Sequence, residues 1–233
     1  MPVRTDAVAD YVALSTSGAP SFTAFTITFW YQIQVSNAGT DRTLFAIEDT
    51  GFGTIHKLFV GGDNINYLAN NATVQAFGTQ PSESQWVMAA LSCAGTGATD
   101  LKGYFWNAAD PDGTYSSAQM TGNGGTLNKW SIGGNHGFSE FRNARFCFVK
   151  VWGAVLSLAE LQAERTQGKP VRTSNVNRYH RLLNNTDTSD GSGNGRTVTF
   201  NGTVTTEGTE PVPWELSAGL ASAHAYYRSM LIR

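Results

Sequence analysis

Apolar and polar side chains alternate most regularly between Phe25 and Val35. Every odd position of this stretch is apolar, whereas the even positions carry Thr, Gln and a single tryptophan, Trp30. Successive side chains of a β-strand point to opposite faces, so the pattern predicts a strand with one face in the core. The other face is expected to meet water or a second layer. A tryptophan on such a face more often packs beneath a loop than stacks on a ligand.

Shorter strand-like runs follow at the spacing typical of all-β proteins, with Gly, Asn and Asp turn residues between them. The expected strands are residues 11–14, 43–47, 57–60, 65–68, 73–77, 86–93, 101–106 and 128–133. The runs 86–93 and 101–106 are expected to form a hairpin. The irregular stretch 107–125 is expected to be a loop at the rim of the sheets.

The pattern changes from strand to helix between residues 143 and 168. Residues 145–152 are aromatic and β-branched, which is typical of a strand packed on both faces. Ser157 and Glu160 have the spacing of a capping box, and Gly168 before Lys-Pro is a stop signal. We therefore expect one short helix near residues 157–168. Its expected apolar side consists of Leu158 and Leu161.

After this helix the pattern predicts two more strands, at residues 176–183 and 197–204, with a polar loop at 184–195 between them. Strands need partners, and the strand at 11–14 otherwise leaves a sheet edge open. We therefore expect the C-terminal strands to pair with the N-terminal one.

This pairing gives one jelly-roll domain over residues 1–210, closed by the strands within 176–204. Residues 211–233 carry little charge and two adjacent tyrosines. They are expected to form a tail that docks on the body or on a neighbouring subunit.

The composition favours one domain without broad electrostatic partners. The 233 residues are 41% hydrophobic, enough to bury a substantial core. Only 15% are charged and the formal net charge is −2, so we expect neither nucleic acid nor an anionic membrane as a partner. The first residues lack a signal-peptide pattern and no long apolar run occurs, so we expect a soluble cytoplasmic product without membrane insertion. Cys93 and Cys147 lie in strand-like runs and are expected to be buried thiols.

Several segments, in their order along the chain, resemble LamG-like modules, which have the concanavalin A-like fold. These segments are DYVAL, FTITFWYQI, QWVMAALSCAG followed by LKGYFWN, SIGG, and FRNARFCFVKVWGAVLSLAELQ. The resemblance implies an all-β, two-sheet antiparallel jelly-roll sandwich with the one short helix. The stretch RYHRLLNNTDTSDGSGNGRTVTFNGT resembles the part that usually opens such a module, here placed at the C-terminal end. A looser resemblance is to LamG-like proteins of tailed phages, and it implies a virion protein.

The chain lacks the residue patterns of the enzymes that share this fold. β-Glucanases of this family use carboxylates two and four or five residues apart on one strand, which places acid and nucleophile on the same face. No strand here has that spacing. Glu48 and Asp49 are adjacent and precede a glycine, so we expect them in a solvated turn. No G-x-S-x-G elbow, phosphate loop or paired metal-ligand spacing occurs, and we expect no enzymatic activity.

Sugar recognition combines an aromatic ring for the apolar side of the sugar with amides and carboxylates for its hydroxyl groups. Residues of these types gather near the end of the strand at 101–106 and at the turn after 128–133. The candidate ligand-binding residues are Trp106, Asn107, Asp110, Asp112, Tyr115, Asn135 and His136. The competing interpretation makes residues 110–113 an ordinary turn and Trp106 a core residue.

Calcium is the only cofactor that the family resemblance suggests. Hard cations need several oxygen ligands on one loop, and Asp187, Asp190 and Asn194 have suitable side chains. The same sequence is also typical of a turn in which Asp side chains bond the backbone without a metal.

Two hypotheses about function follow. The first is a non-catalytic structural or decoration component of a virion or surface assembly, with other proteins of that assembly as partners. The second is a carbohydrate-binding adhesin module that recognises host-surface glycans through the rim residues.

Overall fold

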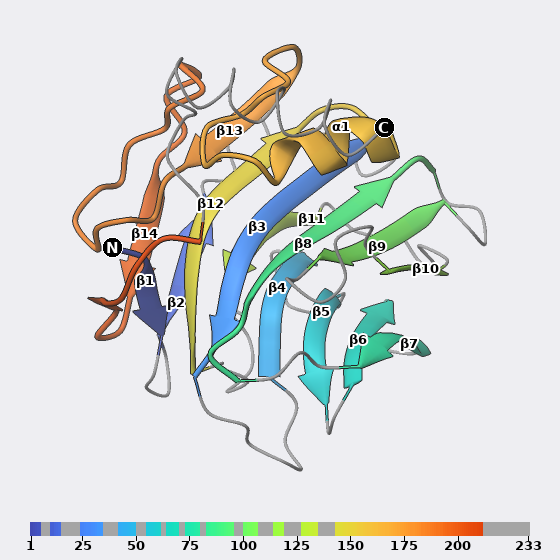
Figure 1. Cartoon of the computed structure of the whole chain (residues 1–233), viewed down its shortest axis with the longest axis horizontal. Helices are drawn as coiled ribbons and strands as arrows, with labels where there is room; N and C mark the ends of the chain where they lie inside the picture. The colour runs from blue at the N-terminus through green and yellow to red at the C-terminus, as the bar shows by residue number, and fades with distance from the viewer. Residues whose placement is uncertain are drawn as a thin grey trace, which may run out of the picture.

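Two antiparallel β-sheets pack face to face in the computed structural model, and one helix lies on the outer face of one sheet (Figure 1). The structure describes residues 1–5, 10–14, 24–34, 42–49, 55–61, 64–69, 73–79, 83–95, 100–106, 114–118, 127–134 and 143–211. Within these ranges the strands form one 8-stranded and one 7-stranded sheet. This is the all-β jelly-roll sandwich with a short helix that the sequence predicts.

The 8-stranded sheet, called the helix sheet below, has the strand order β10-β9-β8-β3-β12-β1-β15, with β13 also paired to β12. Its strands are β1 (Val3–Thr5), β3 (Phe25–Ile33), β8 (Trp86–Cys93), β9 (Leu101–Trp106), β10 (Thr114–Ala118), β12 (Ala144–Trp152), β13 (Val176–His180) and β15 (Thr205–Thr206). The hairpin expected from the runs 86–93 and 101–106 is the pair β8–β9. Strand β10 lies within the stretch that was expected to be irregular.

The 7-stranded sheet, called the opposite sheet, has the order β14-β2-β11-β4-β5-β6-β7. Its strands are β2 (Tyr11–Leu14), β4 (Arg42–Asp49), β5 (Ile55–Gly61), β6 (Asn64–Ala69), β7 (Thr73–Thr79), β11 (Leu127–Ile132) and β14 (Val198–Asn201).

The core lies between the two sheets and is rich in aromatic rings. The odd positions of β3, from Phe25 to Ile33, are all buried in it, as the alternating pattern predicts. The Phe25 ring meets Trp130 of β11 edge-on at a centroid distance of 5.6 Å. Phe45 of β4 lies 6.2 Å from Phe29 and 5.7 Å from Trp130, so both sheets contribute to one cluster. Such edge-to-face pairs add to the stabilisation that apolar burial already supplies.

The outer face of the helix sheet carries a second apolar cluster. It includes Trp30 from β3, Met88 from β8, Trp106 from β9, Trp152 from β12 and Leu161 from the helix. Every residue of β3 is therefore buried, including the even positions. The alternating pattern left either water or a second layer for the outer face of this strand, and the structure has the second packed layer.

A β-bulge in β12 turns the end of that strand toward the helix. Phe148 has a φ of 54°, uncommon for a large side chain, and the register with β3 shifts between Cys147 and Lys150. Cys147 and Phe148 both join the outer cluster, whereas Val149 joins the core. The extra residue changes the phase of the alternation, and the strand beyond it presents Lys150 and Trp152 to the helix side.

Helix α1 (Leu158–Glu164) begins as the sequence predicts. The Ser157 hydroxyl accepts from the Glu160 N–H, and the Glu160 carboxylate accepts from the Ser157 N–H at 2.8 Å, which completes the capping box. Leu161 is buried, but Leu158 is 44% exposed, so the expected apolar side is only half correct. Leu158 is the first residue of the helix and points away from the sheet.

The helix ends earlier than the stop signal at Gly168 indicated. Arg165 is the C-cap residue and keeps a right-handed helical conformation. Gly168 instead packs closely on the Phe148 ring. A Cβ atom at this position would lie only 2.5 Å from a ring carbon, so the contact requires glycine. The glycine is thus explained by a close approach between segments rather than by the helix end.

Strands from both ends of the chain lie side by side (Figure 1). Strand β14 pairs with β2, the neighbour expected for it, and β15 pairs with β1. Of the expected strand at 197–204 the structure has β14, which ends before a turn at Gly202 (φ 76°); beyond this turn the chain crosses from the opposite sheet to the helix sheet and forms β15. Strand β13, which was also expected beside the N-terminal strand, pairs with β12 instead. The tail expected at 211–233 lies outside the described residues except for its first residue.

Cys93 and Cys147 are both buried as thiols, as the sequence predicts. Burial raises the pKa of the Cys93 thiol, and it raises that of Cys147 well above the ordinary value. The two groups are therefore neutral thiols near pH 7. Separately, no helix in the described ranges combines the length and the apolar character that a membrane span requires.

Candidate functional site

Trp106, the aromatic residue of the expected sugar site, is fully buried at the end of β9. Its ring stacks on Tyr104, with centroids 5.5 Å apart and planes 6° from parallel. The guanidinium carbon of Arg165, just after the helix, lies 5.8 Å from the ring centroid. The interpretation of Trp106 as a core residue describes this geometry, because the indole has no face open to a ligand.

Most of the other expected sugar-binding residues lie outside the described part of the chain. These are Asn107, Asp110, Asp112, Asn135 and His136. The backbone of Tyr115 lies in β10, opposite Tyr104 of β9. Gly133, before Asn135 in the sequence, lies close to Thr5 and to Phe146 of β12. Strands β8 and β3 separate β12 from β9 in the sheet, so Gly133 and Trp106 are not brought together.

Asp190, the central residue of the expected calcium loop, has its carboxylate occupied by hydrogen-bond donors. Oδ1 accepts from the N–H groups of Tyr179 and Ser192, both at 2.9 Å. Oδ2 accepts from the Ser192 hydroxyl at 2.8 Å and from the Arg196 N–H at 3.0 Å. Burial raises the pKa of Asp190, but these hydrogen bonds outweigh it and lower the pKa below its usual value. The carboxylate therefore holds the loop against β13 with all of its lone pairs in use.

Asp187 and Asn194 also make contacts within the loop. Asp187 Oδ1 accepts from the Ser189 N–H at 3.1 Å and from its hydroxyl, and the hydroxyl bond is the main cause of a lowered pKa for Asp187. Asn194 Nδ2 donates to the carbonyl oxygens of Val176 and Asn177, each at 3.0 Å. In the described residues no three His, Cys, Asp or Glu side chains form a group able to hold a metal ion. The donor set fits a hydrogen-bonded turn, and we derive no calcium site from it.

Glu48 was expected in a solvated turn, and the structure corrects this. It lies in β4, opposite Lys129 of β11, and is fully buried. Its neighbours Phe45 and Ile47 face the core, so Glu48 belongs to the outer face of the opposite sheet. Burial and the Glu48 charge together raise the pKa of Tyr11. A single carboxylate in this place does not reproduce the paired arrangement that glycosidases need.

A set of polar and aromatic residues at the end of the helix sheet away from α1 was not predicted from the sequence. We call this set the polar–aromatic patch: Gln32, Gln34, Trp86, Arg145 and Glu207. In the sheet, Gln32 lies opposite Trp86 on one side and opposite Arg145 on the other. The period-two pattern placed Gln32 on the polar face of its strand, but its neighbours across the sheet were not visible from spacing.

Hydrogen bonds join Gln32, Gln34, Arg145 and Glu207 of the patch into one network. Gln32 Oε1 accepts from Gln34 Nε2 at 3.0 Å and from Arg145 Nη1 at 2.8 Å. Arg145 Nη2 donates to Glu207 Oε1 at 2.8 Å, and Arg4 of β1 pairs with the other oxygen of Glu207. Hydrogen bonds from Arg4, then from Arg145, lower the pKa of Glu207. Glu207 is therefore a carboxylate that orients two guanidinium groups.

Family models and curated proteins yield no match to this chain. Several solved structures are similar to this chain. A candidate carbohydrate-binding protein from Bacteroides ovatus is 13% identical, with a TM-score of 0.58 over 92% of this chain and 62% of its own. The enzymatically active domain of tailspike protein 2 from bacteriophage CBA120 is 14% identical, with a TM-score of 0.53 over 73% of this chain and 28% of its own.

A third similar structure is the heptameric SAP-like pentraxin from Limulus polyphemus. It is 12% identical, with a TM-score of 0.52 over 85% of this chain and 95% of its own. This chain thus spans less than two thirds of the length of the first two proteins and nearly the full length of the pentraxin. Sequence identities this low speak to the fold alone, and together with the two antiparallel sheets these similarities support a jelly-roll β-sandwich.

Proposed function

We propose that this protein is a non-enzymatic structural or decoration component of a virion or other surface assembly, built on a lectin-like jelly roll. The observation that carries the proposal is the similarity of its fold to a domain of a bacteriophage tailspike over 73% of the chain. The resemblance of the segment order to LamG-like proteins of tailed phages supports the same conclusion.

The acidic side chains of α1 and of the residue after β15 also support a non-enzymatic role. Glu160 caps the helix, Glu164 is buried against Lys150, and Glu207 orients two arginines. Each carboxylate is used to hold segments of the chain together.

The described chain ends at a sheet edge that suits contact with a neighbouring subunit. The N-terminal ammonium lies 3.1 Å from Glu210 Oε1, and β15 is the last strand in the order of the helix sheet. Edge strands offer unpaired backbone groups to another chain. We propose that the tail, residues 211–233, contacts the body or the next subunit.

Deletion of residues 213–233 is expected to abolish assembly, because it removes the proposed contact segment and leaves every described strand in place. Light scattering after size-exclusion chromatography measures the assembly mass. The shortened protein should have the mass of a single chain, whereas the full-length protein should have a mass larger than that of one 25.1 kDa chain. An unchanged melting temperature would show that the body still folds. The same assembly mass, and the same incorporation into particles, for both forms would contradict the proposal.

A second candidate function is carbohydrate binding by an adhesin module. The observation that favours it is the similarity to a candidate carbohydrate-binding protein over 92% of this chain. The proposed ligand-binding residues are the rim residues Asn107, Asp110, Asp112, Tyr115, Asn135 and His136. Trp106 leaves this set because it is buried, and its replacement would report on stability instead.

Replacing Asp112 with Ala is expected to weaken glycan binding at least tenfold, because a carboxylate that accepts from sugar hydroxyls contributes more than a neutral acceptor. A printed glycan array probed with both proteins measures this. Asp187→Ala, in a loop held by its own hydrogen bonds, is the matched control and should bind as the wild type does. Absence of any bound glycan for the wild type would reject the adhesin function.

A further inference from the structure

We propose that the polar–aromatic patch is a saccharide-binding site, in which the Trp86 ring carries the apolar face of a sugar and Gln34 and Arg145 bond its oxygen atoms. This deepens the second candidate function and rests on it, since a sugar must be bound at all. The site lies on the helix sheet rather than among the rim residues.

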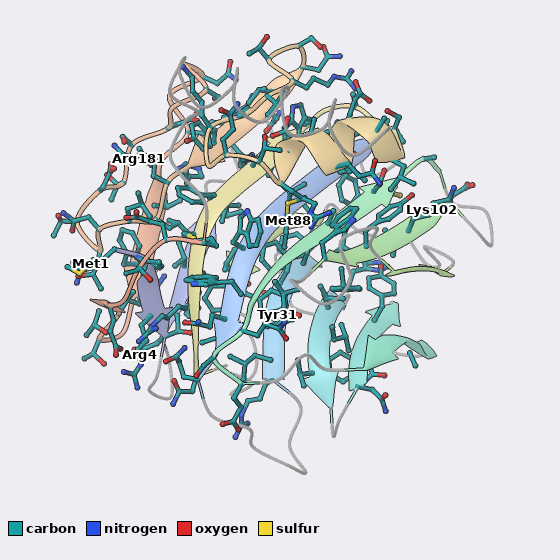
Figure 2. All side chains as sticks on the ribbon, viewed as in Figure 1. Met1, Arg4, Tyr31, Met88, Lys102 and Arg181 are labelled. Atoms are coloured by element: carbon teal, nitrogen blue, oxygen red, sulfur yellow. The ribbon has the colours of Figure 1, made fainter. Side chains whose placement is uncertain are left out.

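The sheet register places the key residues in one row. Trp86 of β8 lies opposite Gln32 of β3, Gln32 lies opposite Arg145 of β12, and Arg145 lies opposite Arg4 of β1. Their neighbours along the strands, among them Tyr31, face the core, so the row faces outward. Neighbouring strands are about 4.8 Å apart, so the row extends roughly 14 Å from Trp86 to Arg4. Figure 2 shows Arg4 at one side of this end of the sheet, well away from α1.

The polar groups of the row are held in place before any ligand arrives. Gln32 accepts from Gln34 and Arg145 through Oε1 and donates through Nε2 to the carbonyl oxygen of Ser84. Glu207 fixes the other end of the Arg145 guanidinium. Side chains that are already ordered lose little entropy on binding, so more of each new hydrogen bond appears as affinity.

The backbone also packs closely on Arg145 at Gly208. Gly208 has a φ of 82°, and a Cβ atom there would lie 2.7 Å from Arg145 Nη1 and 2.9 Å from Cζ. Glycine is thus needed both for the backbone conformation and for the contact. The guanidinium is held between the sheet and the segment after β15, and this leaves it little freedom to reorient.

The composition of the patch favours a sugar over a protein partner. Trp86 is the half-buried aromatic ring, the Gln32 amide lies opposite it in the sheet, and the Arg145 guanidinium lies one strand further along the row. An aromatic face with hydrogen-bonding groups at its side matches the apolar face and polar rim of a sugar ring. Protein interfaces instead need a wider apolar centre on which anchor residues are fully desolvated.

A printed array of neutral and uronic-acid-containing oligosaccharides tests the site, probed with the wild type, Trp86→Ala and Gln34→Ala. We expect Trp86→Ala to reduce binding at least tenfold and Gln34→Ala to reduce it several-fold. Gln162→Ala, at an exposed position of α1, is the matched control for the glutamine change and should bind as the wild type does. Thermal melting shows whether each variant is folded.

The outcomes separate the patch from the function on which it rests. If the wild type binds no oligosaccharide, the adhesin function and the patch are both overturned. If it binds and Asp112→Ala loses binding while Trp86→Ala and Gln34→Ala retain it, the function stands and the patch is overturned. Should Trp86→Ala fail to fold, Gln34→Ala decides alone, because Gln34 lies partly exposed at the end of β3 and contributes no core packing.

Discussion

Replacing Lys150 with Met is expected to destabilise the fold by about 3–5 kcal/mol, the usual cost of removing one partner of a buried ion pair. Lys150 Nζ lies 2.9 Å from Glu164 Oε2, and the side chains are 1% and 0% exposed. The ammonium also donates to the carbonyl oxygens of Gln167 at 2.9 Å and of Glu164 at 3.1 Å. The lysine thus binds the end of α1 and the following turn to β12.

The Glu164 carboxylate would remain buried without its countercharge. It also accepts from the N–H groups of Val171, at 2.9 Å, and Arg172, at 2.7 Å, and so holds the segment that leads to β13. Burial lowers the pKa of Lys150, whereas the nearby Glu164 charge raises it. The desolvation of the ammonium is therefore opposed mainly by this one carboxylate, and the two residues act as a unit.

Urea unfolding at pH 7 measures the effect, and two further variants interpret it. Arg172→Met breaks the partly exposed pair with Glu160 and should cost less than about 1 kcal/mol. The double variant Lys150→Met/Glu164→Leu should recover much of the loss, because no charge is left unpaired. If Lys150→Met costs no more than Arg172→Met, the pair does not hold the helix as argued.

The features that the sequence predicted at this helix are the local ones. The capping box needs only Ser157 and Glu160, three residues apart, and the structure has it. The role of Gly168 was not visible, because it depends on Phe148 from another segment. The Lys150–Glu164 pair was also not predictable, because it depends on a bulge that changes which way Lys150 points.

The polar–aromatic patch shows the same limit. Alternation alone assigned Gln32 to the outer face of its strand. Its contact with Arg145 joins residues far apart in the sequence, and the contact of Arg145 with Glu207 exists only because β15 returns to pair with β1. The ambiguity of Trp106 had a different cause. Both faces of the helix sheet are apolar, and a periodic pattern cannot separate a second packed layer from a binding face.

Acidification below pH 6.5 is expected to destabilise the protein through His56 by up to about 3 kcal/mol. His56 is 1% exposed, and its Nδ1 lies 2.8 Å from the Tyr67 hydroxyl. Burial lowers the pKa of His56 from 6.5 to about 4. The unfolded chain therefore takes up the proton first, and each pH unit between the two pKa values removes about 1.4 kcal/mol. The contribution of the neutral, buried His56 to the free energy of unfolding is complete above pH 6.5 and is lost as the pH falls to about 4.

The comparison with His56→Gln isolates this contribution from that of the carboxylates. The variant should be less stable at pH 7, because the ring that stacks on Tyr67 at 6.1 Å is lost, but its free energy of unfolding should fall less steeply between pH 6.5 and 4.5. His180, whose pKa burial also lowers, remains in both proteins and cancels in the difference. Chemical unfolding at several pH values gives both slopes. Equal slopes would contradict this, because they would mean that His56 is already protonated in the folded state over this pH range. A protonated ring would need an acceptor or a water molecule in the core. The Tyr67 contact and the surrounding apolar side chains accommodate a neutral imidazole instead.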